Sequence, residues 1–443
     1  MIHRPVRWAV ALGTAAVLAG GCAFDQPIPT STNPSQAGPT SSPGAAPGGP
    51  PPAALTSLCP APSPSPSPSP SHTAAPIAKE PSLPPTIADV AGQVEQARGV
   101  KFVHPITPEP VTQQRIGQLL TAGTQDEFPA DMAARRGRAW GTIGAIPAGT
   151  DLNKAVNDFG TSQTIGFYDT QTHRLVFVGT TLPTPLERVT LAHELTHALD
   201  DQRFGLSRLN TLGRLCRDDR SDAFLSLAEG DAVETSVQWA RKFLTPDELA
   251  LLQQEANDQP QPPSSVPSFV EQETLFPYPN GQAFVEALLA RGGTAAVNAA
   301  FRHPPVSTEQ ILHPEKYPGD LPQDVEVPDL AAKLGKGWSS LDVEDTGEGW
   351  LRTLLALRLP QGAAVAGAAG WDGGQYRAWW HGSETAVLLR TVWDSAPEAG
   401  EFGSAMNRWL GDQVGSVRQA GASVAVEFGS DAAALAALER VTG

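Results

Sequence analysis

The chain has 443 residues, of which 18% are charged, and its 47 acidic residues against 31 basic ones give a formal net charge of −16. Contacts to phosphate need clusters of Lys and Arg, so this balance excludes nucleic acid and anionic membrane surfaces as partners. Many of the 42 prolines lie in the first hundred residues. The folded part is therefore nearer about 350 residues, enough for one large core or two modest ones.

Residues 1–21 predict a cleaved signal peptide. Arg4 and Arg7 precede an apolar stretch at residues 8–18 that is too short to cross a bilayer. The run Leu18-Ala19-Gly20-Gly21-Cys22 resembles the lipobox of bacterial lipoproteins, with alanine in place of its usual leucine three residues before the cysteine. The resemblance implies acylation of Cys22 and a place on the extracytoplasmic face of the cell membrane, with the lipid as the only membrane attachment. An ordinary secretory signal is the alternative.

Residues 22–85 predict a disordered stalk. The segment consists largely of Pro, Ser, Thr, Ala and Gly, with a Ser-Pro repeat at residues 62–71. Such a composition cannot bury enough apolar surface to fold, and the repeat favours an extended polyproline helix. If Cys22 is acylated, Cys59 and Cys216 remain as an even pair in an oxidising compartment. They predict a disulfide, with two unpaired thiols as the alternative.

A folded domain is predicted from residue 86 to residue 336. Apolar residues recur with helical spacing at its start, and a hairpin is expected from strands at 164–168 and 174–178. Proline and capping residues mark the starts of several later helices. The expected helices span residues 112–122, 131–143, 185–203, 218–243, 282–290, 294–301 and 308–312, with a short helix after Thr245-Pro246.

Residues 337–443 predict a separate, small α+β subdomain. Helices are expected at 347–357, 396–409 and 430–440, and strands at 376–380, 385–393 and 423–428. The tryptophans of this region are expected in its core. They are Trp371, Trp379, Trp380 and Trp393.

The expected helix at 185–203 contains the run His193-Glu194-Leu195-Thr196-His197. Residues four apart lie on one face of a helix, so His193 and His197 can both reach one tetrahedral Zn²⁺ ion. Glu194 lies beside them, in a position to take a proton from a zinc-activated water as the general base. Apolar residues occupy the opposite face of this helix. A pair of exposed histidines beside a surface glutamate is the alternative interpretation.

The third metal ligand is predicted to be Glu229. Metzincins place a glycine and a third histidine shortly after the second histidine, but Asp200 and Arg203 stand there. Glu229 lies on the next long helix and is followed by Gly230. A glycine inside a helix costs about 1 kcal/mol relative to alanine, so it suits a place where a second backbone comes close, as where two helices cross at a shared zinc.

This arrangement resembles the gluzincins, the thermolysin-like zinc peptidases in which His-Glu-x-x-His is followed by a Glu on the next helix. The similarity is carried by residues 193–202 and 229–232, and more loosely by 277–281 and 307–317. It implies an α+β fold, with a predominantly helical zincin catalytic domain and a small antiparallel sheet. It also implies peptide-bond hydrolysis and an edge strand, here 174–178, that pairs with extended substrate. The sequence departs from the thermolysin pattern, since Ala228 precedes Glu229 and Val233 replaces the acid four residues after it.

Supporting roles are predicted for several other residues. Asp222 lies seven residues before Glu229, on the same helical face, so it can orient a ligand histidine, with an acid facing water as the alternative. Asp231 points away from the metal and is expected to partner an arginine or a backbone group. Candidates to stabilise an oxyanion are His313, Tyr317, Tyr278 and Tyr168.

The sequence thus predicts a zinc metallopeptidase that acts on a peptide or protein substrate outside the cell. A non-catalytic surface lipoprotein that holds zinc structurally is one alternative, although structural sites are usually closed and rich in Cys. A zinc hydrolase of a cell-wall amide is the other.

Overall fold

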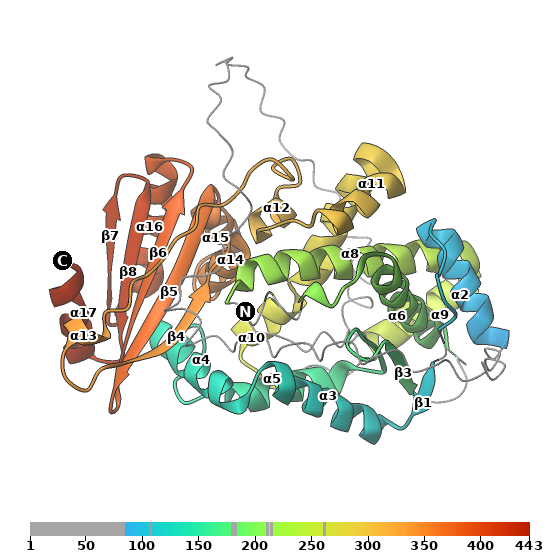
Figure 1. Ribbon diagram of the computed structural model, residues 1–443, viewed down its shortest axis with the longest axis horizontal. Helices are drawn as coiled ribbons and strands as arrows, with labels where there is room; N and C mark the ends of the chain where they lie inside the picture. The colour runs from blue at the N-terminus through green and yellow to red at the C-terminus, as the bar shows by residue number, and fades with distance from the viewer. Residues whose placement is uncertain (1–84, 107, 179–183, 210–211, 213–215, 260–262) are drawn as a thin grey trace, which may run out of the picture.

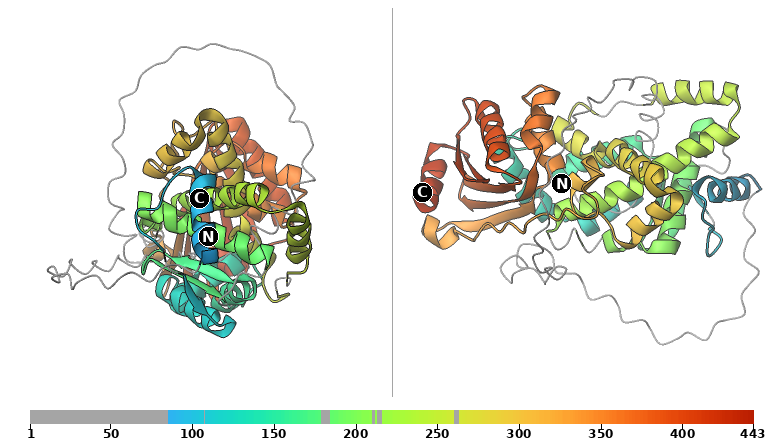
Figure 2. Two further views of the ribbon diagram at one scale, coloured as in Figure 1. Left: turned by 90° about the vertical axis from the view of Figure 1, so that its right-hand side faces the viewer. Right: turned by 90° about the horizontal axis from the view of Figure 1, so that it is seen from above.

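The computed structural model describes residues 85–106, 108–178, 184–209, 212, 216–259 and 263–443. The predicted signal peptide, Cys22, Cys59 and nearly all of the predicted stalk lie outside these ranges. The fold is mixed α+β, mostly helical, with two separate sheets. The helical part with the three-stranded sheet occupies one end of the molecule and the five-stranded sheet the other (Figures 1 and 2). Within the described ranges, no helix has both the length and the apolar character needed to cross a bilayer.

Among the described residues, eight helices lie in the helical part, and all of them except α3 and α10 contribute to one apolar core. The expected helices are present, and the two predicted between 282 and 301 form one element that is kinked at Gly292 and Gly293. The eight helices are α2 (Pro85–Arg98), α3 (Gln113–Glu127), α6 (Pro185–Phe204), α8 (Asp218–Phe243), α9 (Pro246–Asn257), α10 (Ser268–Leu275), α11 (Pro277–Arg302) and α12 (Thr308–Leu312).

Helix α6 has well-defined ends and is enclosed on all sides. Thr184 and Glu187 form a reciprocal capping box at its start, with Pro185 in the first turn, and Gly205 ends it in the left-handed conformation. Every residue from Val189 to Asp201 is buried. The apolar face predicted opposite the histidines packs in the core, but the histidine face is covered as well. Helices α2, α8 and α9 and the small sheet all contact α6.

Helices α8 and α11 approach so closely that only glycine fits at their contact. A Cβ atom on Gly230 would lie 2.1 Å from the carbonyl of Gly281, and one on Gly281 would lie 1.9 Å from the Ser226 carbonyl oxygen. The prediction that Gly230 marks a close backbone approach is confirmed. The approaching backbone, however, is that of α11 and not that of α6, the helix that carries the histidines.

The small sheet has the strand order β1-β3-β2. The predicted hairpin is present as β2 (Gly166–Asp169) and β3 (Arg174–Val178), which pair antiparallel. Strand β1 (Glu109–Val111) pairs in parallel with β3 on its other side. The prediction that 174–178 is an edge strand is therefore wrong, because β1, which the sequence pattern did not reveal, takes that edge. On the hairpin side the edge strand is β2.

The C-terminal part is an antiparallel sheet of five strands in the order β4-β5-β6-β8-β7. Helices α14 (Glu348–Ala356), α15 (Gln361–Ala368) and α16 (Ala396–Leu410) contribute to the core on one face. Helices α13 (Ala331–Leu334) and α17 (Ala432–Thr442) pack on the other. The strands are β4 (Ser339–Asp345), β5 (Trp371–His381), β6 (Glu384–Trp393), β7 (Gly415–Ala420) and β8 (Ser423–Gly429).

Two helices from the first half of the chain belong to this C-terminal core. Residues of α4 (Ala130–Ile143) and α5 (Leu152–Gln163) share one apolar cluster with residues of the sheet and of α14 to α16. The buried guanidinium of Arg136 on α4 donates to Asp342 on β4 and to Asp218 at the start of α8. The predicted boundary between 86–336 and 337–443 therefore does not separate two independent cores. Helices α4 and α5 lie before this boundary in the sequence, but they pack in the core of the C-terminal part.

Most of the C-terminal tryptophans are core residues, as predicted. Trp371, Trp379 and Trp393 are at most 2% exposed. Trp380 is 40% exposed and carries the guanidinium of Arg138 over its ring, so the prediction of burial is wrong for this residue. It follows Trp379 on β5, and successive residues of a strand point to opposite faces.

Replacing Gly230 or Gly281 by alanine is expected to destabilise the protein by about 1–3 kcal/mol or more, because the new methyl group overlaps backbone that cannot move aside. Urea unfolding measures the effect. The matched control is Gly160→Ala in α5, where a Cβ meets nothing within 4 Å and the change should stabilise by up to about 1 kcal/mol. Equal effects at Gly160 and Gly230 would contradict the prediction.

Candidate metal centre

The structure brings the three predicted ligands together. His193 and His197 lie one turn apart on α6, and Glu229 reaches them from α8. The Nε2 atom of His193 lies 2.9 Å from Nε2 of His197 and 3.1 Å from Oε2 of Glu229, and the remaining pair is 3.4 Å apart. All three side chains are buried. They form one of two groups of potential ligands found within the described ranges.

These separations match the demands of a tetrahedral ion. Zinc holds nitrogen and oxygen ligands at about 2.0–2.1 Å, which places neighbouring ligand atoms about 3.3 Å apart. The observed 2.9, 3.1 and 3.4 Å differ from that value by a few tenths of an ångström. Two imidazole nitrogens that face each other beside a carboxylate oxygen form a donor set suited to a shared cation. The residues present therefore fit a single metal ion.

Glu194 lies next to the ligands without joining them. Its Oε2 atom accepts a hydrogen bond of 2.8 Å from the backbone N–H of Tyr168 on β2. Its Oε1 atom makes no hydrogen bond with any described residue. Burial raises the pKa of the Glu194 carboxyl well above its usual range, and the charge of Glu229 adds to the effect. Glu194 thus has the position and the electrostatics of a proton carrier.

Burial and the neighbouring ligands shift the pKa values of Glu229 and His197. Burial opposes ionisation of Glu229, but hydrogen bonds with His193 and His197 outweigh it and lower the pKa of Glu229 to about 2. Burial lowers the pKa of His197 to about 4. A carboxylate beside a neutral imidazole is the state in which both groups bind a metal cation.

A buried arginine, which the sequence did not reveal, holds together the two helices that carry the predicted ligands. Arg98, at the end of α2, donates from Nε to Asp231 on α8, and its NH2 group lies 3.6 Å from Asp200 on α6. It also donates to Asn298 on α11. The prediction that Asp231 partners an arginine is confirmed. Burial alone would lower the pKa of Arg98, but the two carboxylates raise it above its usual value.

Asp222 occupies a cluster of buried acids away from the ligand atoms. It makes no hydrogen bond to His193 or His197, and its Oδ2 atom has no partner among the described residues. Burial raises the pKa of Asp222 well above its usual range, helped by Glu273, Asp218 and Asp219. The structure therefore gives Asp222 neither the predicted contact with a ligand histidine nor a place facing water. The charged groups that face Asp222 are Glu273 of α10 and the two acids at the start of its own helix.

Of the four candidates for an oxyanion contact, Tyr278 alone packs on a ligand, with its ring stacked at 6.5 Å from that of His193. His313 instead interacts through Nε2 with Glu348 at 3.0 Å. Tyr317 donates its hydroxyl to the His303 carbonyl, and Tyr168 donates its hydroxyl to Asp201. The sequence could not rank these residues, because each depends on contacts between distant segments.

Cys216 is buried beside the start of α8 and is disulfide-bonded. Its predicted partner, Cys59, lies outside the described residues, so the pairing itself stays a prediction.

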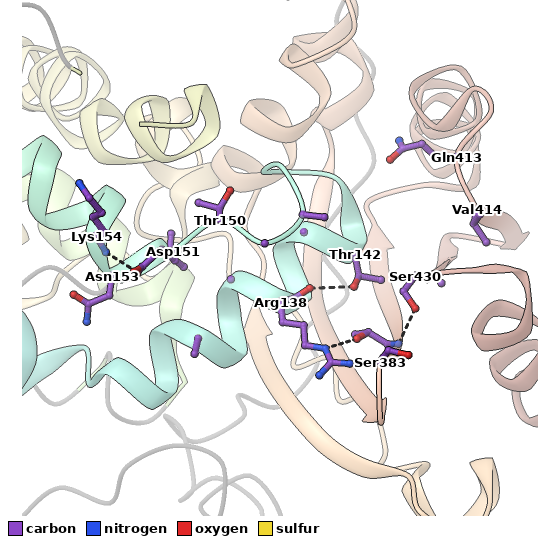
Figure 3. Close-up of a pocket in the computed structure, with 18 of the residues that line it drawn as sticks. Arg138, Thr142, Thr150, Asp151, Asn153, Lys154, Ser383, Gln413, Val414 and Ser430 are labelled. Atoms are coloured by element: carbon purple, nitrogen blue, oxygen red, sulfur yellow. Dashed lines mark hydrogen bonds between the residues drawn. The ribbon is translucent and has the colours of Figure 1, made fainter. Parts of the chain in front are cut away.

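Two other features resemble sites. Glu309, Asp320 and Asp394 converge, but the ammonium group of Lys316 forms an ion pair with each of them and occupies the space between them. A cavity of about 1060 Å³ lies between α4, the start of α5 and the end of the sheet (Figure 3). Several of its polar groups already bond to one another, as when Arg138 donates to Thr385 and Asp151 caps α5. None of the predicted site residues lines it.

A family profile described as a domain of unknown function (DUF8575) matches residues 337–441. The match covers the five-stranded sheet and its C-terminal helices and includes none of the predicted metal ligands. No curated protein and no solved structure shows significant similarity to the chain.

The buried acids predict a measurable dependence of stability on pH. Burial raises the pKa of Glu273 to about 7. Between about pH 4 and pH 7 the unfolded chain loses this proton while the folded protein keeps it, so the wild type loses stability as the pH rises. Glu273→Gln removes this loss, and the variant should gain up to about 3 kcal/mol over the wild type above pH 7 and nothing at pH 4. Denaturant unfolding at both pH values measures it, with Glu271→Gln on the same helix as control. A gain independent of pH would contradict the assignment.

Proposed function

We propose that this protein is a gluzincin-type zinc metallopeptidase that hydrolyses peptide bonds on the extracytoplasmic face of the cell membrane. The observation that carries the proposal is the convergence of His193, His197 and Glu229 beside Glu194. Two imidazoles and one carboxylate are the ligand set of peptidase zinc sites that keep a fourth position open. Structural zinc sites are closed and usually rich in Cys, and none of the three ligands here is a cysteine.

In the proposed reaction each residue of the site has a separate role. His193, His197 and Glu229 would hold the zinc, which supplies Lewis acidity towards a water molecule and the peptide carbonyl. Glu194 accepts the proton from the attacking water and delivers it to the leaving amine. The N–H of Tyr168 keeps the Glu194 carboxylate at the position from which it acts. Arg98 fixes α6 and α8 relative to each other, which maintains the distance between the histidines and Glu229.

The proposed location is supported by the sequence before residue 86 and by the disulfide bond at Cys216. The signal sequence and Cys22 favour a lipid anchor, and the proline-rich segment would hold the folded part away from the membrane. The disulfide at Cys216 favours an oxidising compartment.

Glu194→Gln is expected to keep one zinc per chain while lowering peptide hydrolysis by about 10²-fold to 10⁴-fold, because only the proton acceptor is lost. His197→Ala is expected to lose both zinc and hydrolysis. Metal analysis and cleavage of a broad peptide library measure the two quantities. Survival of hydrolysis in Glu194→Gln would show that the mechanism is wrong.

The two alternatives make different predictions in the same assays. A cell-wall amidase would cleave labelled wall fragments and leave peptides intact. A scaffold protein with structural zinc would cleave neither, and a hydroxamate that chelates an open zinc would not bind to it. The proposed peptidase should cleave peptides and be inhibited by the hydroxamate.

A further inference from the structure

The hairpin β2–β3 is tied to α6 at two points, two helical turns apart. At one point the Tyr168 N–H donates to Glu194, and at the other the Tyr168 hydroxyl donates to Oδ2 of Asp201 at 2.8 Å. Glu194 and Asp201 are seven residues apart, so they lie on the same face of α6, about 10 Å from each other. A single tyrosine thus spans the distance from the proposed general base to the last turn of its helix.

Contacts with neighbouring backbone fix the Asp201 side chain in the position from which it binds Tyr168. Its side chain is 3% exposed, and its Oδ1 atom accepts the N–H of Leu206 at 2.7 Å while its carbonyl accepts the N–H of Gly205. The same Oδ2 atom that binds Tyr168 lies 2.7 Å from Nδ1 of His173. Asp201 is therefore fixed to the end of α6 by backbone contacts and holds the hairpin with its other oxygen.

His173 adds a second contact from the hairpin turn. It adopts a left-handed backbone conformation, with φ 54°, which is uncommon for a residue with a side chain. This conformation brings an otherwise exposed imidazole onto the buried Asp201 carboxylate. Both ends of the turn that links β2 to β3 are thus anchored at one carboxylate.

We propose that Asp201, acting through Tyr168 and supported by His173, is a positioning residue that fixes the backbone N–H by which Glu194 is held. The proposal rests on the proposed function, since it concerns the residue assigned as the general base. Glu194 makes no second hydrogen bond within the described part of the chain, so its orientation depends on Tyr168. A hairpin released from Asp201 would leave the carboxylate beside the metal ligands but without a fixed direction.

The test compares variants of the full-length, zinc-loaded protein. Tyr168→Phe removes the hydroxyl and keeps the backbone N–H. Asp201→Asn leaves one acceptor oxygen where Asp201 offers two, one for Leu206 and one shared by Tyr168 and His173. Each is expected to lower kcat by about 10-fold to 100-fold, the usual cost of losing such a supporting contact. KM should stay within about twofold and zinc content at one per chain, since an effect confined to the chemical step lowers kcat alone. The double variant should be no worse than the poorer single variant, because the two side chains act as one unit.

The matched control is Tyr376→Phe. Tyr376 is also a buried tyrosine whose hydroxyl donates to a buried aspartate, Asp342, but it lies in the C-terminal sheet. Its loss should cost comparable stability and leave kcat unchanged. If Tyr168→Phe and Asp201→Asn keep wild-type kcat, or if Tyr376→Phe loses kcat equally, the positioning role is wrong. If the wild type with bound zinc cleaves no peptide at all, it is the proposed function that fails.

Discussion

The close contact between α8 and α11 is the constraint on which the proposed metal centre depends. It occurs at Gly230, the residue directly after Glu229, so the backbone that carries the third ligand is pressed against α11. A helix fixed at that point cannot rotate to turn Glu229 away from the histidines. The cost of a glycine inside a helix is offset by the packing that its missing side chain permits. The position of one proposed ligand is thus set by steric exclusion within the protein itself.

Buried charge supplies the second constraint, and it also acts on α8. Arg98 binds Asp231 near the middle of this helix, and Arg136 binds Asp218 at its start. The two arginines come from different helices and connect α8 to different parts of the molecule, α2 in one case and the five-stranded sheet in the other. A buried ion pair contributes little net stability, but removing one partner leaves an uncompensated charge. The pairs therefore restrict the alternative packings open to α8.

The sequence predicted local features well and distant ones poorly. Caps and proline positions located α6 and α9, helical periodicity located α8, and two strand-like runs joined by a polar turn located the hairpin, because these signals lie within a few residues of the elements that they define. The shared face of His193 and His197 followed from helix geometry alone. Geometry also indicated that Asp231 does not face the metal ligands, but only the structure shows that its partner is Arg98. Strand β1 was missed because three residues carry no pattern, and its pairing removed β3 from the edge. The positions of Asp222 and His313 depended on α10 and on Glu348, which no local pattern connects to them.

Helix α4 gives the C-terminal sheet a component from outside the region of the DUF8575 match. The sheet and the helices that follow it are contiguous in sequence, yet Trp140 of α4 is wholly buried and donates from its indole to Glu344 of β4. A gene fragment that starts at residue 337 would therefore encode a protein with an open apolar face and two acids, Asp342 and Glu344, deprived of Arg136. In this chain the folding of the matched region is thus tied to a helix that lies some two hundred residues earlier, since Arg136 and Asp342 are 206 positions apart.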